Sequence, residues 1–99
     1  MAKGYWIAHV TVHDPEGYKQ YIAANAAPLA KFGGRFLVRS GQHELPVGSI
    51  PAGQRHVVIE FDSFATAKAC YHSPDYEAAA KIRDRYSSAN IVIIEGYDG

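Results

Sequence analysis

The residues best suited to chemistry are two histidines and a glutamate in stretches of alternating sequence. His9, His56 and Glu60 fall on one face of strands that we expect at 5–12 and 55–61. A histidine oriented by a carboxylate can act as a general base near neutral pH. We favour the other interpretation, in which both imidazoles form hydrogen bonds in an interface, because a fold alone does not fix a function.

The same three side chains are of the types that bind zinc. No short paired motif such as His-Glu-x-x-His occurs in the sequence. We therefore expect no metal site, and the sequence gives no reason to expect another cofactor.

Arg39 is the best single candidate for binding an anion, because a guanidinium matches a carboxylate through two hydrogen bonds. The competing interpretation is an ion pair with Glu60 or Glu95 on the same face of the sheet. Tyr5, from that face, is a further candidate for ligand binding. So are Tyr76 and Arg83, which lie seven residues apart on one helical stripe, although Arg83 could equally be solvated.

The elements that must position these side chains are visible in the sequence pattern. Alternation predicts strands at 5–12, 35–40, 55–61 and 90–95. Asp14-Pro15, Ser63 and Ser73-Pro74 are typical helix starts, and they predict helices that end near Gly33, Tyr71 and Tyr86. The stretch 41–53 is a long loop, either a lid or a mobile connector.

This order predicts one α+β domain over 1–99, a ferredoxin-like βαββαβ sandwich with an antiparallel sheet in the order 4-1-3-2. The helices should cover the more apolar face of each strand. The residues expected on that covered face are Trp6, Val10, Phe36, Val38, Val57, Ile59, Val92 and Ile94.

The opposite face of the predicted sheet mixes aliphatic and ionisable side chains. Its expected members are Tyr5, Ile7, His9, Thr11, Leu37, Arg39, His56, Val58, Glu60, Ile91, Ile93 and Glu95. Such a face is too apolar for open water. We expect two copies to pair face to face, enclosing a cavity lined by His9, Arg39, His56 and Glu60.

Composition excludes several classes of protein. Ten basic residues balance ten acidic ones, and the isoelectric point is near 7, so neither a nucleic acid nor an anionic membrane is an expected partner. The chain has one cysteine and therefore no internal disulfide. With no membrane-spanning apolar run and no signal peptide, a cytoplasmic protein is expected.

A set of short phrases spread over nearly the whole chain resembles one family. The phrases are Asp14-Pro15-Glu16 with Tyr18 and Tyr21, Gly33-Gly34-Arg35-Phe36, Glu60-Phe61, and Tyr71-His72-Ser73-Pro74-Asp75-Tyr76 with Arg83. The sequence is similar to the family called domain of unknown function 1330. Family members often carry tryptophan where this chain has Cys70.

The resemblance implies the dimeric α/β-barrel superfamily, whose branches include cofactor-free monooxygenases, small isomerases, haem enzymes and ligand-sensing modules. Our first hypothesis is a homodimer that binds a small organic molecule in a cavity between each sheet and its partner or helices. The alternative is a cofactor-independent monooxygenase or isomerase acting on a small organic acid or ketone. In that case His9 or His56 would move the proton and Arg39 would hold the anionic group.

Overall fold

The computed structural model describes residues 2–99. Four strands and three helices follow in the order β1 (Gly4–Val12), α1 (Pro15–Lys31), β2 (Arg35–Arg39), β3 (Arg55–Phe61), α2 (Phe64–Tyr71), α3 (Pro74–Tyr86) and β4 (Ser87–Glu95). The predicted elements are all present, and β4 begins three residues before the predicted start at Asn90.

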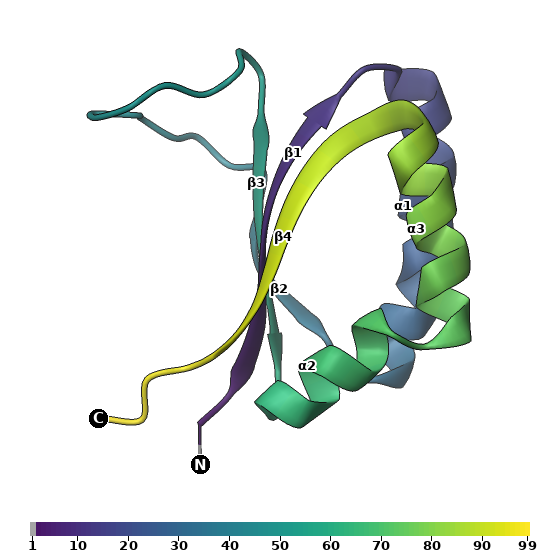
Figure 1. Cartoon of the computed structure of the whole chain (residues 1–99), viewed down its shortest axis with the longest axis vertical. Helices are drawn as coiled ribbons and strands as arrows, with labels where there is room; N and C mark the ends of the chain where they lie inside the picture. The colour runs from purple at the N-terminus through teal and green to yellow at the C-terminus, as the bar shows by residue number, and fades with distance from the viewer. Residues whose placement is uncertain (1) are drawn as a thin grey trace.

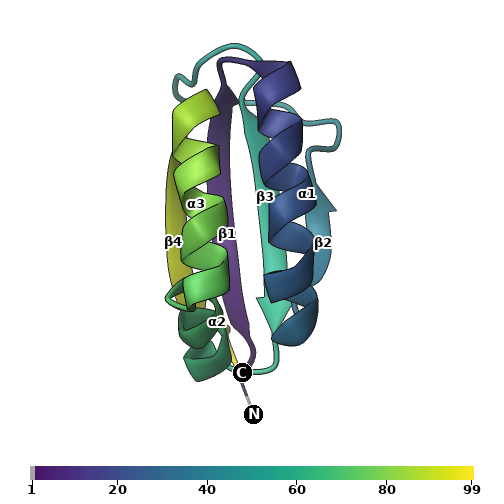
Figure 2. The same ribbon diagram turned by 90° about the vertical axis from the view of Figure 1, so that its right-hand side faces the viewer.

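The sheet is antiparallel in the order β2-β3-β1-β4, which is the predicted order read from the other edge. All three helices lie on one side of the sheet, and the other face is open (Figure 1). α1 lies over β3 and β2, while α3 lies over β1 and β4 (Figure 2). The architecture is the predicted ferredoxin-like α+β sandwich.

The helix starts follow from the capping residues in the sequence. Asp14 accepts a hydrogen bond of 3.1 Å from the Gly17 amide, and Pro15 occupies the first turn of α1. The hydroxyls of Ser63 and Ser73 accept backbone hydrogen bonds in the same way at the starts of α2 and α3. α1 ends at Lys31 and the chain turns at Gly33, whose φ of 72° is the left-handed conformation that glycine adopts without strain.

An aromatic cluster around Trp6 holds the sheet to the helices. The indole is 2% exposed and donates a hydrogen bond of 2.8 Å to the Ala67 carbonyl oxygen of α2. Its ring centre lies 5.1 Å from that of Phe61, 5.4 Å from Tyr71 and 4.8 Å from Tyr76. Aromatic pairs at this spacing contribute about 0.5–1.5 kcal/mol each beyond the area they bury.

The faces predicted for β4 are wrong. Trp6 pairs with Ile93, so Ile93 and its alternate Ile91 pack on the core beneath the helices. Val92 and Ile94 lie on the open face, where they are 53% and 45% exposed. The sequence could not decide this point, because all four side chains are aliphatic and alternation alone does not name the buried set.

A β-bulge in β2 corrects a second prediction. Val38 pairs with Val58 and Arg39 with Val57, and Leu37 is the extra residue in the shifted register. The bulge places Val38 on the open face and Arg39 on the face that the helices cover. Both assignments are the reverse of those predicted by simple alternation.

Candidate functional site

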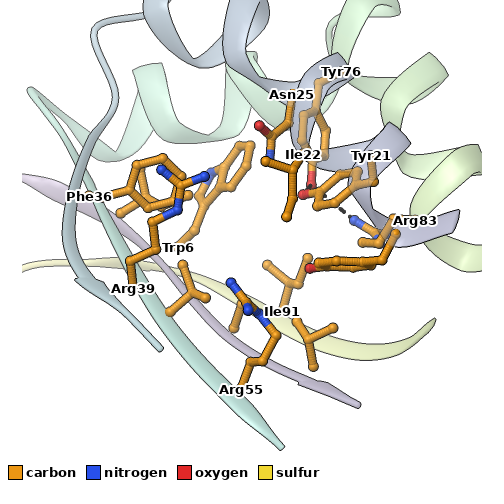
Figure 3. Close-up of a pocket in the computed structure, with 15 residues that line it drawn as sticks. Trp6, Tyr21, Ile22, Asn25, Phe36, Arg39, Arg55, Tyr76, Arg83 and Ile91 are labelled. Carbon is orange, nitrogen blue, oxygen red and sulfur yellow. Dashed lines mark hydrogen bonds between the residues drawn. The ribbon is translucent and has the colours of Figure 1, made fainter. Parts of the chain in front are cut away.

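A cavity lies between the helix-covered face of the sheet and α1 and α3 (Figure 3). Its enclosed part measures about 40 Å³, and the space rises to about 480 Å³ when the part open to solvent is included. Its walls are mostly aromatic and aliphatic, and its polar members come from both layers. The lining residues are Trp6, Ala8, Val10, Tyr18, Tyr21, Ile22, Asn25, Phe36, Arg39, Arg55, Val57, Ile59, Tyr76, Arg83 and Ile91.

Two arginines enter this cavity from the strands on either side of the long loop. The Arg39 guanidinium lies 4.1 Å from the ring centre of Phe36, and that of Arg55 lies 5.7 Å from the ring centre of Tyr18. The Nε atom of Arg55 is buried and has no hydrogen-bond partner. Within residues 2–99, neither arginine forms an ion pair with a carboxylate.

The residues that line the cavity, taken from the described range 2–99, include neither an acidic residue nor a histidine. The nearby phenol of Tyr18 is buried, and this burial raises its pKa while Arg55 partly opposes the rise. Tyr18 therefore stays neutral at physiological pH and supplies no countercharge. Arg39 is exposed and Arg55 is half-buried, so the buried Nε atom of Arg55 is the group whose hydrogen bond is unmet, and an anion entering the cavity would satisfy it.

The third arginine of the cavity differs from the other two because its hydrogen bonds are made. Arg83 donates to the hydroxyls of Tyr76 and Tyr71, both at 3.1 Å, and to Asp84 at 3.0 Å. Tyr76 is fully buried, and its hydroxyl lies 2.6 Å from that of Tyr21 on α1. Burial, and then the neighbouring Tyr21, raise the pKa of Tyr76 well above its ordinary value. Arg83 is thus a structural part of the wall.

The open face of the sheet holds a group of histidines on the other side from the cavity. His9 and His56 pair across β1 and β3, with their Nδ1 atoms 2.9 Å apart. His43, from the loop, packs its ring edge-on against His56 with ring centres 4.5 Å apart. Burial, then His43 and then His9, lower the pKa of His56. His56 is therefore held in its neutral form.

Glu60 lies on the open face but belongs to a separate cluster. It accepts hydrogen bonds from Arg35 at 2.9 Å and from Tyr5 at 3.0 Å. These bonds, that of Arg35 first, lower the pKa of Glu60, and the bond to Glu60 raises the pKa of Tyr5. The ionic partner of Glu60 is thus Arg35, and not Arg39 as the sequence suggested.

The residues predicted from the sequence therefore divide between two places. His9, His56, Glu60 and Tyr5 lie on the open face, whereas Arg39, Tyr76 and Arg83 line the cavity. The predicted enclosed site that joined Arg39 to His9, His56 and Glu60 is not formed, because the bulge in β2 turns Arg39 to the other face of the sheet.

The sequence reasoning missed three polar residues of the cavity. Arg55 shares the alternation of Val57 and Ile59, and a charged residue in such a series was a usable signal. Asn25 falls within the apolar stripe of α1 and is 7% exposed, and Tyr21 appeared only among the residues that carry the family resemblance.

The part of the chain that the structure describes also bears on metal binding, on the reactivity of Cys70 and on membrane crossing. Within residues 2–99, no group of three or more His, Cys, Asp or Glu side chains is arranged to hold a metal ion. Burial raises the pKa of the Cys70 thiol to about 11, so this thiol is inert at neutral pH. None of the described helices is long and apolar enough to cross a membrane.

Several solved structures share this architecture. A protein of unknown function from Rhodopseudomonas palustris superposes with a TM-score of 0.76 at 15% identity, covering 99% of this chain and 85% of that one. A cofactor-independent oxygenase from Streptomyces nogalater gives 0.69 at 14% identity, with 100% and 97% covered. A dimeric ferredoxin-like protein of unknown function from Thermobifida fusca gives 0.59 at 21%, with 95% and 89% covered.

The match of the sequence to a family model is more specific than these similarities of fold. The family described as domain of unknown function (DUF1330) matches residues 3–97, and the chain belongs to that family. No curated protein matches the sequence. Neither the family match nor the similar structures assign a ligand or a reaction to this chain, so its proposed function rests on the cavity.

The histidine group on the open face predicts a pH-dependent stability. The folded state holds the pKa of His56 below its ordinary value of 6.5, so the unfolded chain binds the proton more readily. The free energy of unfolding should therefore fall as the pH is lowered from about 7.5 to about 5. Urea denaturation across this range should show a shallower fall in His56→Gln.

The matched control is His13→Gln, because the His13 side chain is exposed and its ring forms a hydrogen bond with the Ser88 hydroxyl, at 2.8 Å. This variant should keep the slope of the wild type. A fall in stability that is equally steep in His56→Gln and in the wild type would contradict the assignment of this proton to His56.

Proposed function

We propose that this protein binds a small organic anion in the cavity between the sheet and α1. One observation carries the proposal: Arg39 and Arg55 line the cavity with no carboxylate partner among the described residues, and the Nε atom of Arg55 is buried and unpaired. A carboxylate would satisfy this guanidinium and neutralise its charge. The long loop joins the strands that carry the two arginines, so a ligand there would contact both ends of the loop.

Size and wall chemistry narrow the class of ligand. The enclosed part of the cavity holds only about 40 Å³ and opens to solvent, so a bound ligand would place one group inside and extend through the opening. The walls around the arginines include Trp6, Tyr18 and Phe36, which favour an aromatic or otherwise apolar body over a sugar or a phosphate ester. An apolar monocarboxylate fits both requirements.

Binding is better supported than catalysis. A cofactor-independent oxygenase shares the fold, but a likeness at 14% identity carries no activity to this chain. A reaction that begins with proton abstraction needs a general base, and the described lining offers neither a histidine nor a carboxylate. His9 and His56 lie on the far face of the sheet, where a ligand in the cavity cannot reach them.

The open face supports a second part of the proposal, which is self-association. Exposed aliphatic side chains cover both edges of this face: Leu37, Val38, Val92 and Ile94. Partly buried ones, Ile7 and Val58, lie at its centre. Water-exposed apolar patches of this kind usually mark interfaces. A second copy of this chain fits, because the formal net charge is zero and opposes no approach, and the similar Thermobifida protein is described as dimeric.

The proposed ligand class makes a direct prediction for binding. The probe 4-isopropylbenzoate should bind, and Arg55→Met or Arg39→Met should each weaken its affinity by about tenfold or more, because a hydrogen bond to a charged group is lost. Isothermal titration calorimetry measures the affinities. The matched control is Arg35→Met, which removes an arginine of the open face that is paired with Glu60.

Two outcomes would contradict the anion site. One is an Arg35→Met variant that weakens binding as much as Arg55→Met does. The other is equal affinity for the uncharged probe 4-isopropylbenzamide, which has the same body and no charge.

The proposed interface predicts the mass of the particle in solution. Sedimentation velocity should give twice the chain mass of 10.8 kDa for the wild type. Val92→Glu should shift the distribution towards the monomer, because Val92 is 53% exposed on the open face and a buried, unpaired carboxylate is costly. Val47→Glu should not, because Val47 is 84% exposed on the loop. A monomeric wild type would contradict the interface.

A further inference from the structure

We propose that Tyr21 and Asn25 form a second polar subsite in the cavity, which binds an acceptor oxygen carried by the body of the anionic ligand. The ligand class narrows accordingly to an organic acid that bears a keto, enolate or phenolate oxygen. This inference rests on the proposed anion-binding function and adds a specificity-determining site to it.

Both residues come from one turn of α1. They lie four positions apart and so share one face of the helix, and both line the cavity. Tyr21 is 8% exposed and Asn25 is 7% exposed. The Asn25 amide forms no hydrogen bond with another described side chain or backbone group. Among the described side-chain N and O atoms, only Arg55 Nε is fully buried and unpaired, so the Asn25 amide is accessible from the cavity or from solvent, where it can bond polar atoms of a ligand or of water.

The direction of the tyrosine proton follows from counting donors and acceptors. Arg83 donates to the Tyr76 oxygen, and one proton lies between the hydroxyls of Tyr76 and Tyr21. If Tyr21 donated that proton, the hydroxyl proton of the fully buried Tyr76 would have no acceptor, which is costly. Tyr76 therefore donates to Tyr21, and the hydroxyl proton of Tyr21 remains available to the cavity.

The network behind Tyr21 fixes this arrangement. Arg83 is itself held by Tyr71 and Asp84, so it presents its Nη1 donor to Tyr76 from a buried and fixed position. Successive donation from Arg83 to Tyr76 and from Tyr76 to Tyr21 polarises the last O–H bond and strengthens it as a donor. Tyr76 and Arg83 are thus positioning residues, and Tyr21 is the group that contacts the ligand.

The two polar regions of the cavity come from different layers of the fold. Arg39 and Arg55 enter from the strands, whereas Tyr21 and Asn25 enter from the helix (Figure 3). Apolar side chains, including Trp6 and Ile22, complete the wall. A ligand that satisfies both regions carries a carboxylate on one side of an apolar body and an acceptor oxygen on another.

The test compares two carboxylate probes of similar shape, 4-acetylbenzoate and 4-isopropylbenzoate, in the intact protein. The wild type should bind the ketone about tenfold more tightly, because only the ketone accepts the free hydrogen bonds of Tyr21 and Asn25. Tyr21→Phe should reduce this preference to near one and change the affinity for 4-isopropylbenzoate less than about twofold. The control Tyr86→Phe alters a tyrosine outside the cavity lining and should keep the preference.

Further readouts separate hydrogen bonding from packing. The infrared stretch of the ketone carbonyl should move to lower frequency on binding to the wild type but not to Tyr21→Phe. Asn25→Leu should lower the preference while keeping part of the infrared shift. Tyr76→Phe should weaken both, because the Tyr21 hydroxyl is then no longer oriented by a donor.

The outcomes distinguish this inference from the function on which it rests. Equal affinities of the wild type for the two probes, with binding still dependent on Arg55, would overturn the Tyr21–Asn25 subsite and leave the anion site intact. A preference for the ketone that survives in Tyr21→Phe would also overturn it. Failure of the wild type to bind either carboxylate would overturn both proposals.

Discussion

The buried indole of Trp6 is the contact on which the rest of the structure depends. Its hydrogen bond to the Ala67 carbonyl joins the central strand β1 to α2, and its ring packs against Tyr76 of α3. Tyr76 in turn bonds Tyr21 of α1 and receives Arg83. Trp6 thus connects the sheet directly to α2 and α3, and through Tyr76 to α1. The indole also forms part of the cavity wall. The shape of the cavity is a consequence of the core packing.

The positive charges of its arginine side chains distinguish this cavity from the rest of the core. A domain of this kind usually pairs or solvates its charged groups. Here Arg83 is paired, but Arg39 and Arg55 enter the same apolar space without a carboxylate. Of the two, only Arg55 is partly desolvated in the empty site, since it is half-buried and its Nε atom is buried and unpaired, whereas Arg39 is exposed. An anion that bonds to Arg55 therefore has less desolvation to overcome. The two faces of the sheet then have different proposed roles: the covered face binds a ligand, and the open face binds a second copy.

Much of the fold could be predicted from the sequence, because its local signals agree with one another. Asp14, Ser63 and Ser73 cap the three helices, Gly33 ends the first, and alternation marks the four strands. Alternation has two limits, however. It does not choose between faces when both are aliphatic, as in β4, and it fails where a bulge adds a residue.

The bulge in β2 is the reason why the predicted site is not formed. The bulge in β2 leaves no mark in the alternation of 35–39, yet it moves Arg39 to the covered face. Arg55 needed no structure to be noticed, because it stands in register with the buried residues of its strand. The network of Tyr21, Tyr76 and Arg83 joins residues distant in sequence, and only the packing of α1 on α3 brings them together.

The most direct test of the anion site is a crystal structure of the protein with 4-iodobenzoate, whose iodine can be located by anomalous scattering. We expect one iodine peak inside the cavity between the sheet and α1, with the carboxylate within hydrogen-bonding distance of the Arg39 or Arg55 guanidinium. An empty cavity in crystals grown at saturating probe, or a carboxylate bound only on the open face, would contradict it.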